Sequence, residues 1–251
     1  MAGTGTGGSR AAGVGGAAIG LAAERVIDKC RTVAAHKLEA AEEDIAFDDG
    51  TFTVVGTDRT MTLIDAAKMA QNFMTAPPGM EIGLSEWAAW RPPAPTFPNG
   101  CHVCEVEIDQ ETGTIDILAY KVIDDVGTVL NPLLLKGQIQ GGVAHGIGQA
   151  LTEEIRCAPV NGQLIPGPFR DYSRPRADDM SNIDVVSSPG PTKTNPMGCK
   201  GAGEAGTVGA VPAVMNAVVD ALSPLGVRHV DMPATPERIW RAIQDAKAAT
   251  A

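Results

Sequence analysis

Apolar residues recur every three or four positions in the first part of the chain, from residue 14 to residue 38. Charged residues separate them, and the apolar positions are Ile19, Ala23, Val26, Ile27, Cys30, Val33 and Ala34. This spacing predicts one amphipathic helix. Downstream, residues 44–55 are predicted to form two short strands around an Asp48-Asp49-Gly50 turn. Thr62 is predicted to cap a helix that continues to Gln71.

The region from Thr75 to Asn99 shows no such period. Prolines interrupt it at positions 77, 78, 92, 93, 95 and 98. Because proline fixes φ and lacks a backbone N–H, this composition predicts a long crossover without regular structure.

Alternation of apolar and polar residues marks the next region. Residues 102–108 and 114–124 alternate around a turn at 109–113, which predicts a β-hairpin. Asn131 and Pro132 predict the start of a helix that continues toward Glu153, interrupted by glycines at 141, 142, 146 and 148. Glycines at this density indicate close packing against a partner.

The remaining elements are a strand near residues 183–186, a glycine-rich loop at 198–206, a helix over 208–222 and a last helix capped by Thr235. Together the elements predict an α+β fold without an internal repeat. The chain divides into three parts: residues 1–75, a proline-rich crossover at 76–100, and residues 101–251. With 251 residues, 44% of them hydrophobic, it is long enough to bury a sizeable core.

The net negative charge of the chain argues against two classes of binding partner. Twenty Lys and Arg against 30 Asp and Glu give a formal net charge of −10, which repels nucleic acid and anionic membrane surfaces. No apolar run is expected to approach the roughly 20 residues that cross a bilayer, and the first residues do not match a secretion signal. The five cysteines are irregularly spaced, so reduced thiols and a cytoplasmic location are expected.

Two glycine-rich loops contain the candidate chemistry, and the first runs from Gly3 to Arg10. It leads into the predicted helix, where backbone N–H groups, the helix dipole and Arg10 would converge on an anion. Gly3, Gly5 and Gly8 match G-x-G-x-x-G, but only two residues precede Gly3, so no strand leads into the turn as a dinucleotide site requires. The alternatives are a flexible tail and a domain whose first part is missing.

The second loop, residues 195–206, places Glu204 among very small residues immediately before a helix. Small residues let the backbone approach a bulky ligand, and Glu204 is the only acid or base of the stretch besides Lys200. This arrangement suits a general base. The plainer alternative is a solvated glutamate favoured by the dipole of the helix.

Six stretches of the chain, these two loops included, resemble the second molybdopterin-binding domain of the xanthine dehydrogenase/aldehyde oxidase family, in particular its carbon monoxide dehydrogenase large-chain type. They occur in the family's order over nearly the whole chain, at residues 3–16, 97–108, 122–127 with 131–132, 137–151, 171–179 and 194–209. The resemblance implies the C-terminal portion of a large subunit, with a domain incomplete at its N-terminus.

The same resemblance implies a molybdenum hydroxylase. In this family a molybdenum centre on a pterin cofactor carries a hydroxyl, a glutamate corresponding to Glu204 removes its proton, and the oxygen attacks an electron-poor carbon. The carbon belongs to an aldehyde, an N-heterocycle or a similar small molecule, and hydride passes to a sulfido ligand.

The resemblance also implies the cofactor contacts and the partners. The contacts are Thr6, Gly7, Gly8, Ser9, Arg10, His145, Gly201, Ala202 and Gly203. Many family members carry Gln at the position of His145. The cofactor is molybdenum-molybdopterin in its cytosine dinucleotide form. The implied partners are the N-terminal half of the molybdopterin subunit, an iron–sulfur subunit with two [2Fe-2S] clusters and an FAD subunit, because no cysteine pattern in this chain suits such clusters.

Other polar groups have plainer explanations. Gln138 and Gln140 fit helix packing as well as a cofactor contact, and Cys199 fits a packing role. Cys101-His102-x-Cys104 lacks the second pair of ligands that a structural zinc site needs. Residues 174–179 are expected to form a surface salt-bridge cluster.

Two other functions stay open. A non-catalytic binding or scaffold module of the same fold would hold no metal, so it would purify without molybdenum and pterin. A nucleotide-binding protein that uses the N-terminal loop would show nucleotide affinity in the isolated chain.

Overall fold

The computed structural model describes residue 5, residues 7–180 and residues 182–250 of the chain. Its contacts divide the chain into two compact units. The larger unit consists of Met1–Gly13 and Pro93–Ala251, and the smaller of Val14–Pro92. This division differs from the three-part division expected from the sequence, because the N-terminal glycine loop belongs with the C-terminal part of the chain.

The smaller unit packs two helices against a three-stranded sheet. Strands β1 (Ile45–Asp48), β2 (Thr51–Val54) and β3 (Thr60–Thr62) are antiparallel and lie in the order β1-β2-β3. Helix α1 (Ala17–Leu38) follows a π-helical turn at Ala11–Gly16, and α2 is Leu63–Ala70. Phe52, Val33 and Ala66 are fully buried in the shared core.

Local signals explain this unit. Asp49 and Gly50 both have positive φ, 40° and 74°, as the tight turn of a two-residue hairpin requires. Thr62 Oγ1 accepts the N–H of Asp65 at 3.1 Å and caps α2. The predicted turn and cap are confirmed. Strand β3 was not expected, because three residues are too few to display a period.

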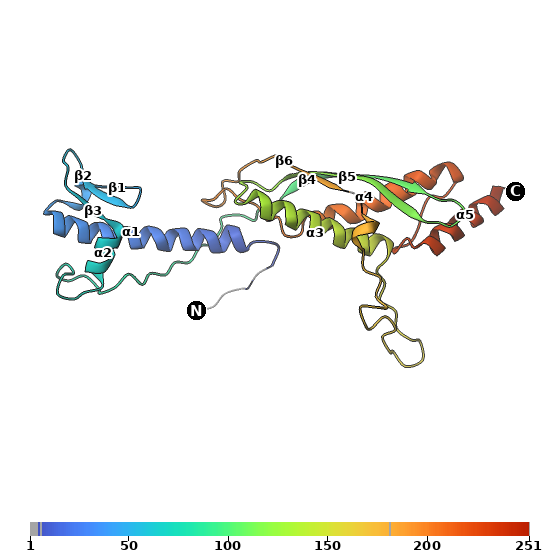
Figure 1. The fold of residues 1–251 in the computed structure, drawn as a ribbon, viewed down its shortest axis with the longest axis horizontal. Coiled ribbons are helices and arrows are strands. Elements are labelled where there is room, and N and C mark those ends of the chain that lie inside the picture. Colours follow the sequence, from blue (N-terminus) through green and yellow to red (C-terminus); the bar gives the residue numbers. More distant parts are fainter. Residues whose placement is uncertain (1–4, 6, 181, 251) are drawn as a thin grey trace. The chain divides into compact units, whose positions relative to one another are not determined.

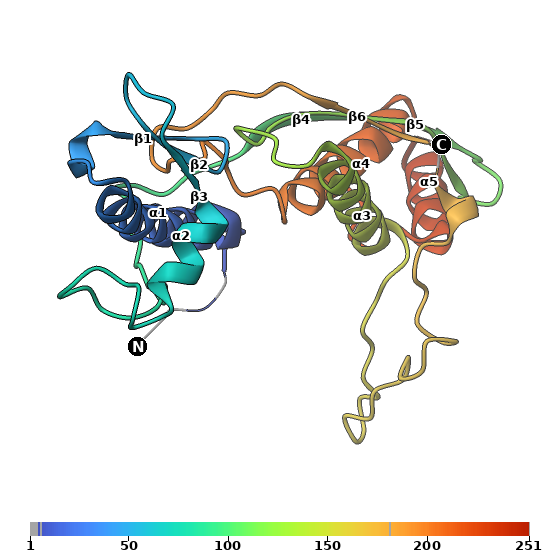
Figure 2. The ribbon, with the colours of Figure 1, turned by 60° about the vertical axis from the view of Figure 1, so that its left-hand side comes forward.

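The larger unit is a three-stranded sheet with helices on one face. Strands β4 (Asn99–Ile108) and β5 (Ile115–Asp125) form the predicted hairpin, and β6 (Ile183–Ser187) joins β5 in parallel. Helices α3 (Pro132–Leu151) and α4 (Ala205–Leu222) cover the same face of this sheet, as Figures 1 and 2 show, and α5 (Pro236–Thr250) completes the core. The mixed helix and sheet content confirms the α+β prediction.

Glycines let α3 and α4 approach each other closely. A Cβ at Gly206 would lie 2.4 Å from the carbonyl oxygen of Ile139, and one at Gly146 would lie 2.5 Å from the Cβ of Ala210. The predicted close packing is therefore confirmed, and the partner is a helix of the same unit. The predicted interruptions of α3 are wrong, since the helix is continuous from Pro132 to Leu151.

Helix α4 with the turn after it, Ala205–Leu225, is long and apolar enough to cross a membrane by length and composition alone, and no other helix in the described residues is. The expectation that no run approaches this length is thus corrected. One face of the helix, with Ala210, Val214, Val218 and Leu222, is buried in the core of the larger unit. The absence of a membrane partner and the cytoplasmic location stay predictions.

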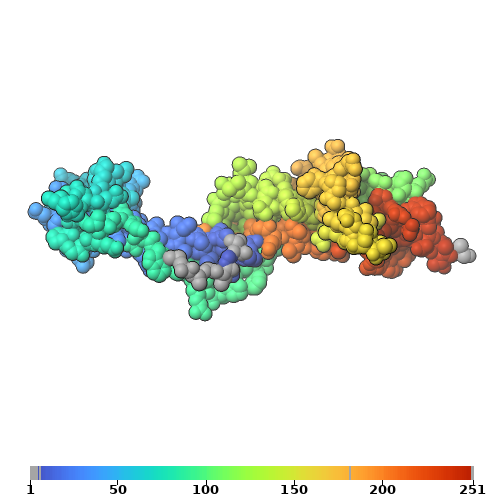
Figure 3. All heavy atoms as spheres, turned by 90° about the horizontal axis from the view of Figure 1, so that it is seen from below, coloured from blue at the N-terminus to red at the C-terminus, as the bar shows by residue number. Residues whose placement is uncertain are grey.

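A long loop connects α3 to β6 (yellow to orange in Figures 1 and 3). Val160 in this loop is 97% exposed. The guanidinium of Arg174 lies 4.4 Å from the centroid of the Phe169 ring, and Asp179 accepts the N–H of Arg176 at 2.7 Å. The predicted salt-bridge cluster at 174–179 is wrong for these described residues, because the arginine stacks on an aromatic ring and the carboxylate binds backbone.

Candidate active site

The described part of the N-terminal glycine loop, Gly5 and residues 7–10, lies against the glutamate loop, residues 195–206, in the larger unit. A Cβ at Gly201 would be 2.8 Å from the Cβ of Ser9 and 2.9 Å from its carbonyl oxygen. A Cβ at Gly203 would be 2.7 Å from the hydroxyl oxygen of Ser9. Glycine at both positions therefore leaves room for Ser9, and the fold joins two loops from opposite ends of the chain.

The described part of the glycine loop, Gly5 and residues 7–10, contains backbone conformations that favour glycine. Gly5, Gly8 and Ser9 have positive φ of 69°, 58° and 56°, a conformation that is uncommon for a residue with a Cβ such as serine. Arg10 Nη2 donates to the carbonyl oxygen of Gly5 at 2.8 Å. A Cβ at Gly5, Gly7 or Gly8 would meet no atom of the described residues within 4 Å, which leaves room for a ligand to approach the backbone there.

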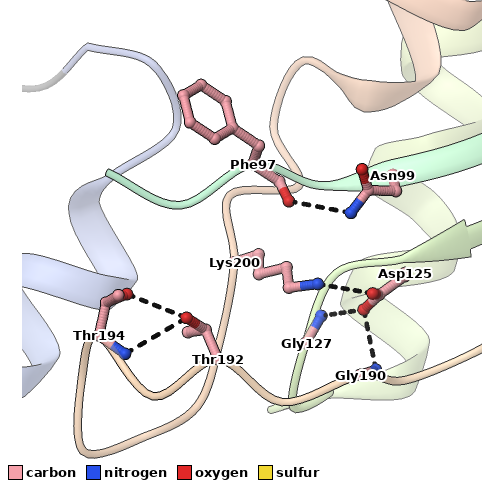
Figure 4. Close-up of polar contacts among 8 residues, drawn as sticks. All are labelled: Phe97, Asn99, Asp125, Gly127, Gly190, Thr192, Thr194 and Lys200. Atoms are coloured by element: carbon pink, nitrogen blue, oxygen red, sulfur yellow. Dashed lines mark hydrogen bonds and ion pairs between the residues drawn. The ribbon is translucent and has the colours of Figure 1, made fainter. Parts of the chain in front are cut away.

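A carboxylate at the end of β5 holds the glutamate loop (Figure 4). Asp125 accepts the N–H of Gly127 at 2.9 Å and that of Gly190 at 2.8 Å, and its other oxygen lies 2.5 Å from Lys200 Nζ. The hydrogen bond from Lys200, followed by the N–H of Gly127, lowers the pKa of Asp125 from 3.8 to about 2. Asp125 is therefore ionised at neutral pH.

Backbone hydrogen bonds hold the same loop at Lys200 and at Gly198, two residues before it. The N–H of Lys200 donates to Val126 at 2.7 Å, and the carbonyl oxygen of Gly198 accepts from Thr128 at 2.9 Å and from Thr192 at 3.0 Å. Gly127 has a positive φ of 69°, and a Cβ there would be 2.3 Å from the Gly198 oxygen.

Cys199 is buried in this loop. Asn195 Nδ2 donates to its carbonyl oxygen at 2.8 Å, and burial raises the pKa of its thiol. A buried thiol with a raised pKa is a poor nucleophile. These contacts support the predicted packing role of Cys199.

Glu204 follows the held segment directly. Gln138 on α3 donates from Nε2 to the carbonyl oxygen of Gly203 at 2.9 Å. Glu204 is the residue before α4, its side chain is exposed, and its carboxylate has no hydrogen-bond partner within the described chain. The backbone is thus held on both sides of residues 201–203 while the carboxylate remains available to a ligand.

A buried polar cluster lies under the start of α4. His102 Nδ1 is 2.9 Å from the hydroxyl of Tyr120, and His102 Nε2 is 3.5 Å from Asp124 Oδ1. The imidazole ring occupies the space that a side chain at Gly209 would take, 2.6 Å from its ideal Cβ. Cys101 is exposed whereas His102 is turned inward on β4, so these two side chains do not converge on one ion.

The structure brings most of the predicted residues together. Gly8, Ser9, Gly201 and Gly203 are in direct contact, and Gly7, Arg10 and Ala202 lie in the same two loops. His145 is exposed on α3 and hydrogen-bonds to no described residue. Thr6 lies outside the described residues.

The roles of Gln140, Asp125 and Lys200 became visible only in the structure. Gln140 donates to the carbonyl oxygen of Ile183 at 2.9 Å, which is a packing role. Sequence reasoning missed Asp125 and Lys200. The sequence features that could have identified them are an acidic residue at the end of a predicted strand, for Asp125, and the single cation of the glutamate loop, for Lys200.

Known proteins resemble the chain over nearly its whole length. A family model for a molybdopterin cofactor-binding domain matches residues 1–181. The carbon monoxide dehydrogenase large chain of Hydrogenophaga pseudoflava is 36% identical over 244 residues, which cover 97% of this chain and 30% of that relative. The nicotine 6-hydroxylase large subunit of Paenarthrobacter nicotinovorans is 38% identical over 242 residues, or 96% of this chain and 30% of the relative.

A solved structure agrees with these sequence matches. Quinoline 2-oxidoreductase from Pseudomonas putida 86 superimposes with a TM-score of 0.86 at 38% identity, over 97% of this chain and 31% of that one. The chain thus spans about 30% of the length of the curated relatives it matches. The chain belongs to the molybdopterin cofactor-binding domain family, and corresponds to the C-terminal part of the molybdopterin subunit of oxidoreductases of the xanthine dehydrogenase/aldehyde oxidase type.

Proposed function

We propose that this chain supplies the general base and one wall of the cofactor site in a molybdenum hydroxylase. The enzyme acts on an aldehyde, an N-heterocycle or a similar electron-poor carbon. One observation supports the proposal most strongly. The Glu204 carboxylate is exposed, has no hydrogen-bond partner among the described residues, and follows a loop that packs against Ser9 of the glycine loop.

The residues present fit a pterin cofactor with a phosphate end. Gly5, Gly7 and Gly8 leave room for a ligand beside the backbone, and Arg10 follows them in the loop. Backbone N–H groups and a guanidinium are suitable donors for phosphate oxygens. We therefore assign Gly7, Gly8, Ser9 and Arg10 to cofactor binding, with the cytosine dinucleotide as the form bound. Gly201, Ala202 and Gly203 would form the adjoining wall, while Thr6 and His145 are assigned by resemblance alone.

The chemical work of the chain itself falls to Glu204. The cofactor, when bound, supplies the redox chemistry of the reaction. Glu204, the residue directly before α4, would accept the proton of the hydroxyl that attacks the substrate carbon. Gln138 and the contact with Ser9 hold the backbone on its N-terminal side.

The extent of the match to the relatives supports a proposal about partners. The relatives are named as a large chain and a large subunit, and the matched region is about 30% of each. We propose that the N-terminal half of the molybdopterin subunit, an iron–sulfur subunit and an FAD subunit complete the enzyme.

Replacement of Glu204 by Gln in the complete enzyme tests the proposal. Loss of the base is expected to lower kcat by about 100-fold to 10,000-fold, while molybdenum content stays at the wild-type level. Glu237→Gln is the matched control, because Glu237 is an exposed glutamate that pairs with Arg241 on α5. Wild-type turnover of Glu204→Gln with full molybdenum content would refute the assignment. A complex that purifies without molybdenum and pterin would favour the scaffold module instead.

A further inference from the structure

The glutamate loop contains a half-buried ion pair that the chemistry proposed above does not use. Lys200 and Asp125 are 2.5 Å apart, and their side chains are 13% and 24% exposed. The pair joins residues that are 75 positions apart in the sequence. The pair therefore ties the glutamate loop to the end of a distant strand.

We propose that the Asp125–Lys200 pair is a positioning device, which holds the glutamate loop so that the Glu204 carboxylate stays at the place where it accepts the proton. This inference rests on the proposed role of Glu204. Neither residue is assigned a contact with substrate or cofactor.

The composition of the loop explains why a device is needed. Between Lys200 and Glu204 the chain is Gly201-Ala202-Gly203, and none of these residues has a side chain that can anchor the backbone. Small residues admit a bulky ligand, but glycine also leaves the backbone conformationally free. The loop therefore needs an anchor at each end. Gln138 holds the carbonyl oxygen of Gly203 at the later end, and at the earlier end the Lys200 side chain adds a side-chain anchor to the backbone hydrogen bond from Lys200 to Val126.

Asp125 is well placed to act as the fixed half of the pair. It ends β5, and it accepts the N–H groups of Gly127 and Gly190 as well as the ammonium of Lys200. Figure 4 shows these three donors converging on one carboxylate from three segments of the chain. A shift of the loop relative to the sheet would break the ion pair, so the pair fixes the register of the loop.

The pair is tested in the complete molybdenum-containing enzyme with Lys200→Met. Loss of the anchor is expected to lower kcat by about 100-fold, since a displacement of roughly 1 Å at a reacting group has an effect of this size. KM and molybdenum content should stay within about two-fold of wild type, because the loop's other contacts remain. Amide hydrogen exchange of residues 198–208 should become faster, and exchange elsewhere in the larger unit should not.

Conservative replacement separates positioning from general stability. Lys200→Arg keeps a positive charge and N–H donors toward the Asp125 carboxylate, so it should restore kcat to within about ten-fold of wild type together with slow exchange of the loop. The matched control is Glu154→Gln, which breaks the pair between Glu154 and Arg238, 2.7 Å apart, with side chains 26% and 33% exposed. This pair lies outside the glutamate loop, and its loss should change neither kcat nor the exchange of residues 198–208.

Two results would overturn the inference. One is a wild-type kcat in Lys200→Met. The other is a lower kcat that arginine does not restore and that accompanies faster exchange across the whole unit. If Lys200→Met fails to assemble, Lys200→Gln takes its place, and a kcat unchanged from wild type in that variant overturns the inference equally.

Glu204→Gln in the same preparation distinguishes the two proposals. An inactive Glu204→Gln beside a fully active Lys200→Met would leave the base assignment standing and remove the positioning role. A fully active Glu204→Gln would remove the base assignment, and the positioning role that rests on it would fall as well.

Discussion

A single methyl group added at Gly206 should weaken the helix pair that supports the glutamate loop. In Gly206→Ala the new Cβ would lie 2.4 Å from the carbonyl oxygen of Ile139 and 3.0 Å from the N–H nitrogen of Val143. Both atoms belong to the backbone of α3 and cannot rotate away. Since comfortable separations are near 3.5 Å, the two helices would have to part by roughly 1 Å.

Two opposing effects decide the magnitude. Alanine in place of glycine stabilises a helix by roughly 1 kcal/mol. Overpacking in a closely packed core destabilises by about 1–3 kcal/mol, and a clash with backbone belongs at the upper end. The net expectation is a loss of about 1–2 kcal/mol, which corresponds to roughly 5-fold to 30-fold faster opening of the helix pair.

Amide hydrogen exchange of α4 in the full chain measures this opening, and it reports on one helix pair without requiring the two units to unfold together. Gly141→Ala is the matched control, because Gly141 lies on α3 and an added Cβ meets no atom within 4 Å. Amide exchange of Gly141→Ala should be unchanged or slower than in the wild type, because alanine adds up to about 1 kcal/mol of helix stability. Equal or slower exchange of α4 in Gly206→Ala would show that the glycines do not set the distance between the helices.

Three further predictions concern other parts of the chain. Phe52→Ala should destabilise the smaller unit by about 3–5 kcal/mol, because Phe52 is fully buried. Amide hydrogen exchange of α1 should become faster, and exchange at the wild-type rate would contradict the assigned core. The pKa of Asp125 is lowered from 3.8 to about 2, so its contribution to stability is present above pH 3.8 and is lost as the pH falls toward 2. Asp125→Asn should remove this part of the pH dependence of the free energy of unfolding. The same dependence below about pH 4 in the variant and in the wild type would contradict the ion pair. Gly127→Ala should speed amide hydrogen exchange of residues 198–200 more than Gly162→Ala speeds exchange of its own turn. Both glycines have positive φ, 69° and 70°, but only at Gly127 would a Cβ lie 2.3 Å from an oxygen. Equal effects would argue against the close approach at Gly127.

Much of the fold could be predicted because short-range signals agree with it. The cap at Thr62, the turn at Asp49 and Gly50, and the Asn131-Pro132 start of α3 all depend on neighbouring residues. The continuity of α3 could not be predicted from its own sequence. Gly142 and Gly146 lie against α4, and that contact joins residues far apart in the chain.

The candidate site likewise has one part that local sequence predicts and another that only the fold reveals. Glu204 stood out because a single acidic group among very small residues is unusual before a helix. The contact between Ser9 and Gly201 joins residues far apart in the sequence, and the partners of Asp125 come from three segments. Such pairings depend on the register of the folded sheet, so composition and spacing do not reveal them. Gly201, Ala202 and Gly203 leave room for a ligand beside the glutamate loop, and the proposed role of the Asp125–Lys200 pair is to hold that loop in place.

A crystal structure of the complete enzyme with its molybdenum cofactor bound would test the central claim most directly. We expect a carboxylate oxygen of Glu204 within about 2.6–3.2 Å of a ligand atom of the metal, with the open face of Gly7 and Gly8 against the cofactor. A Glu204 side chain that faces bulk solvent, with the cofactor away from both loops, would contradict the account.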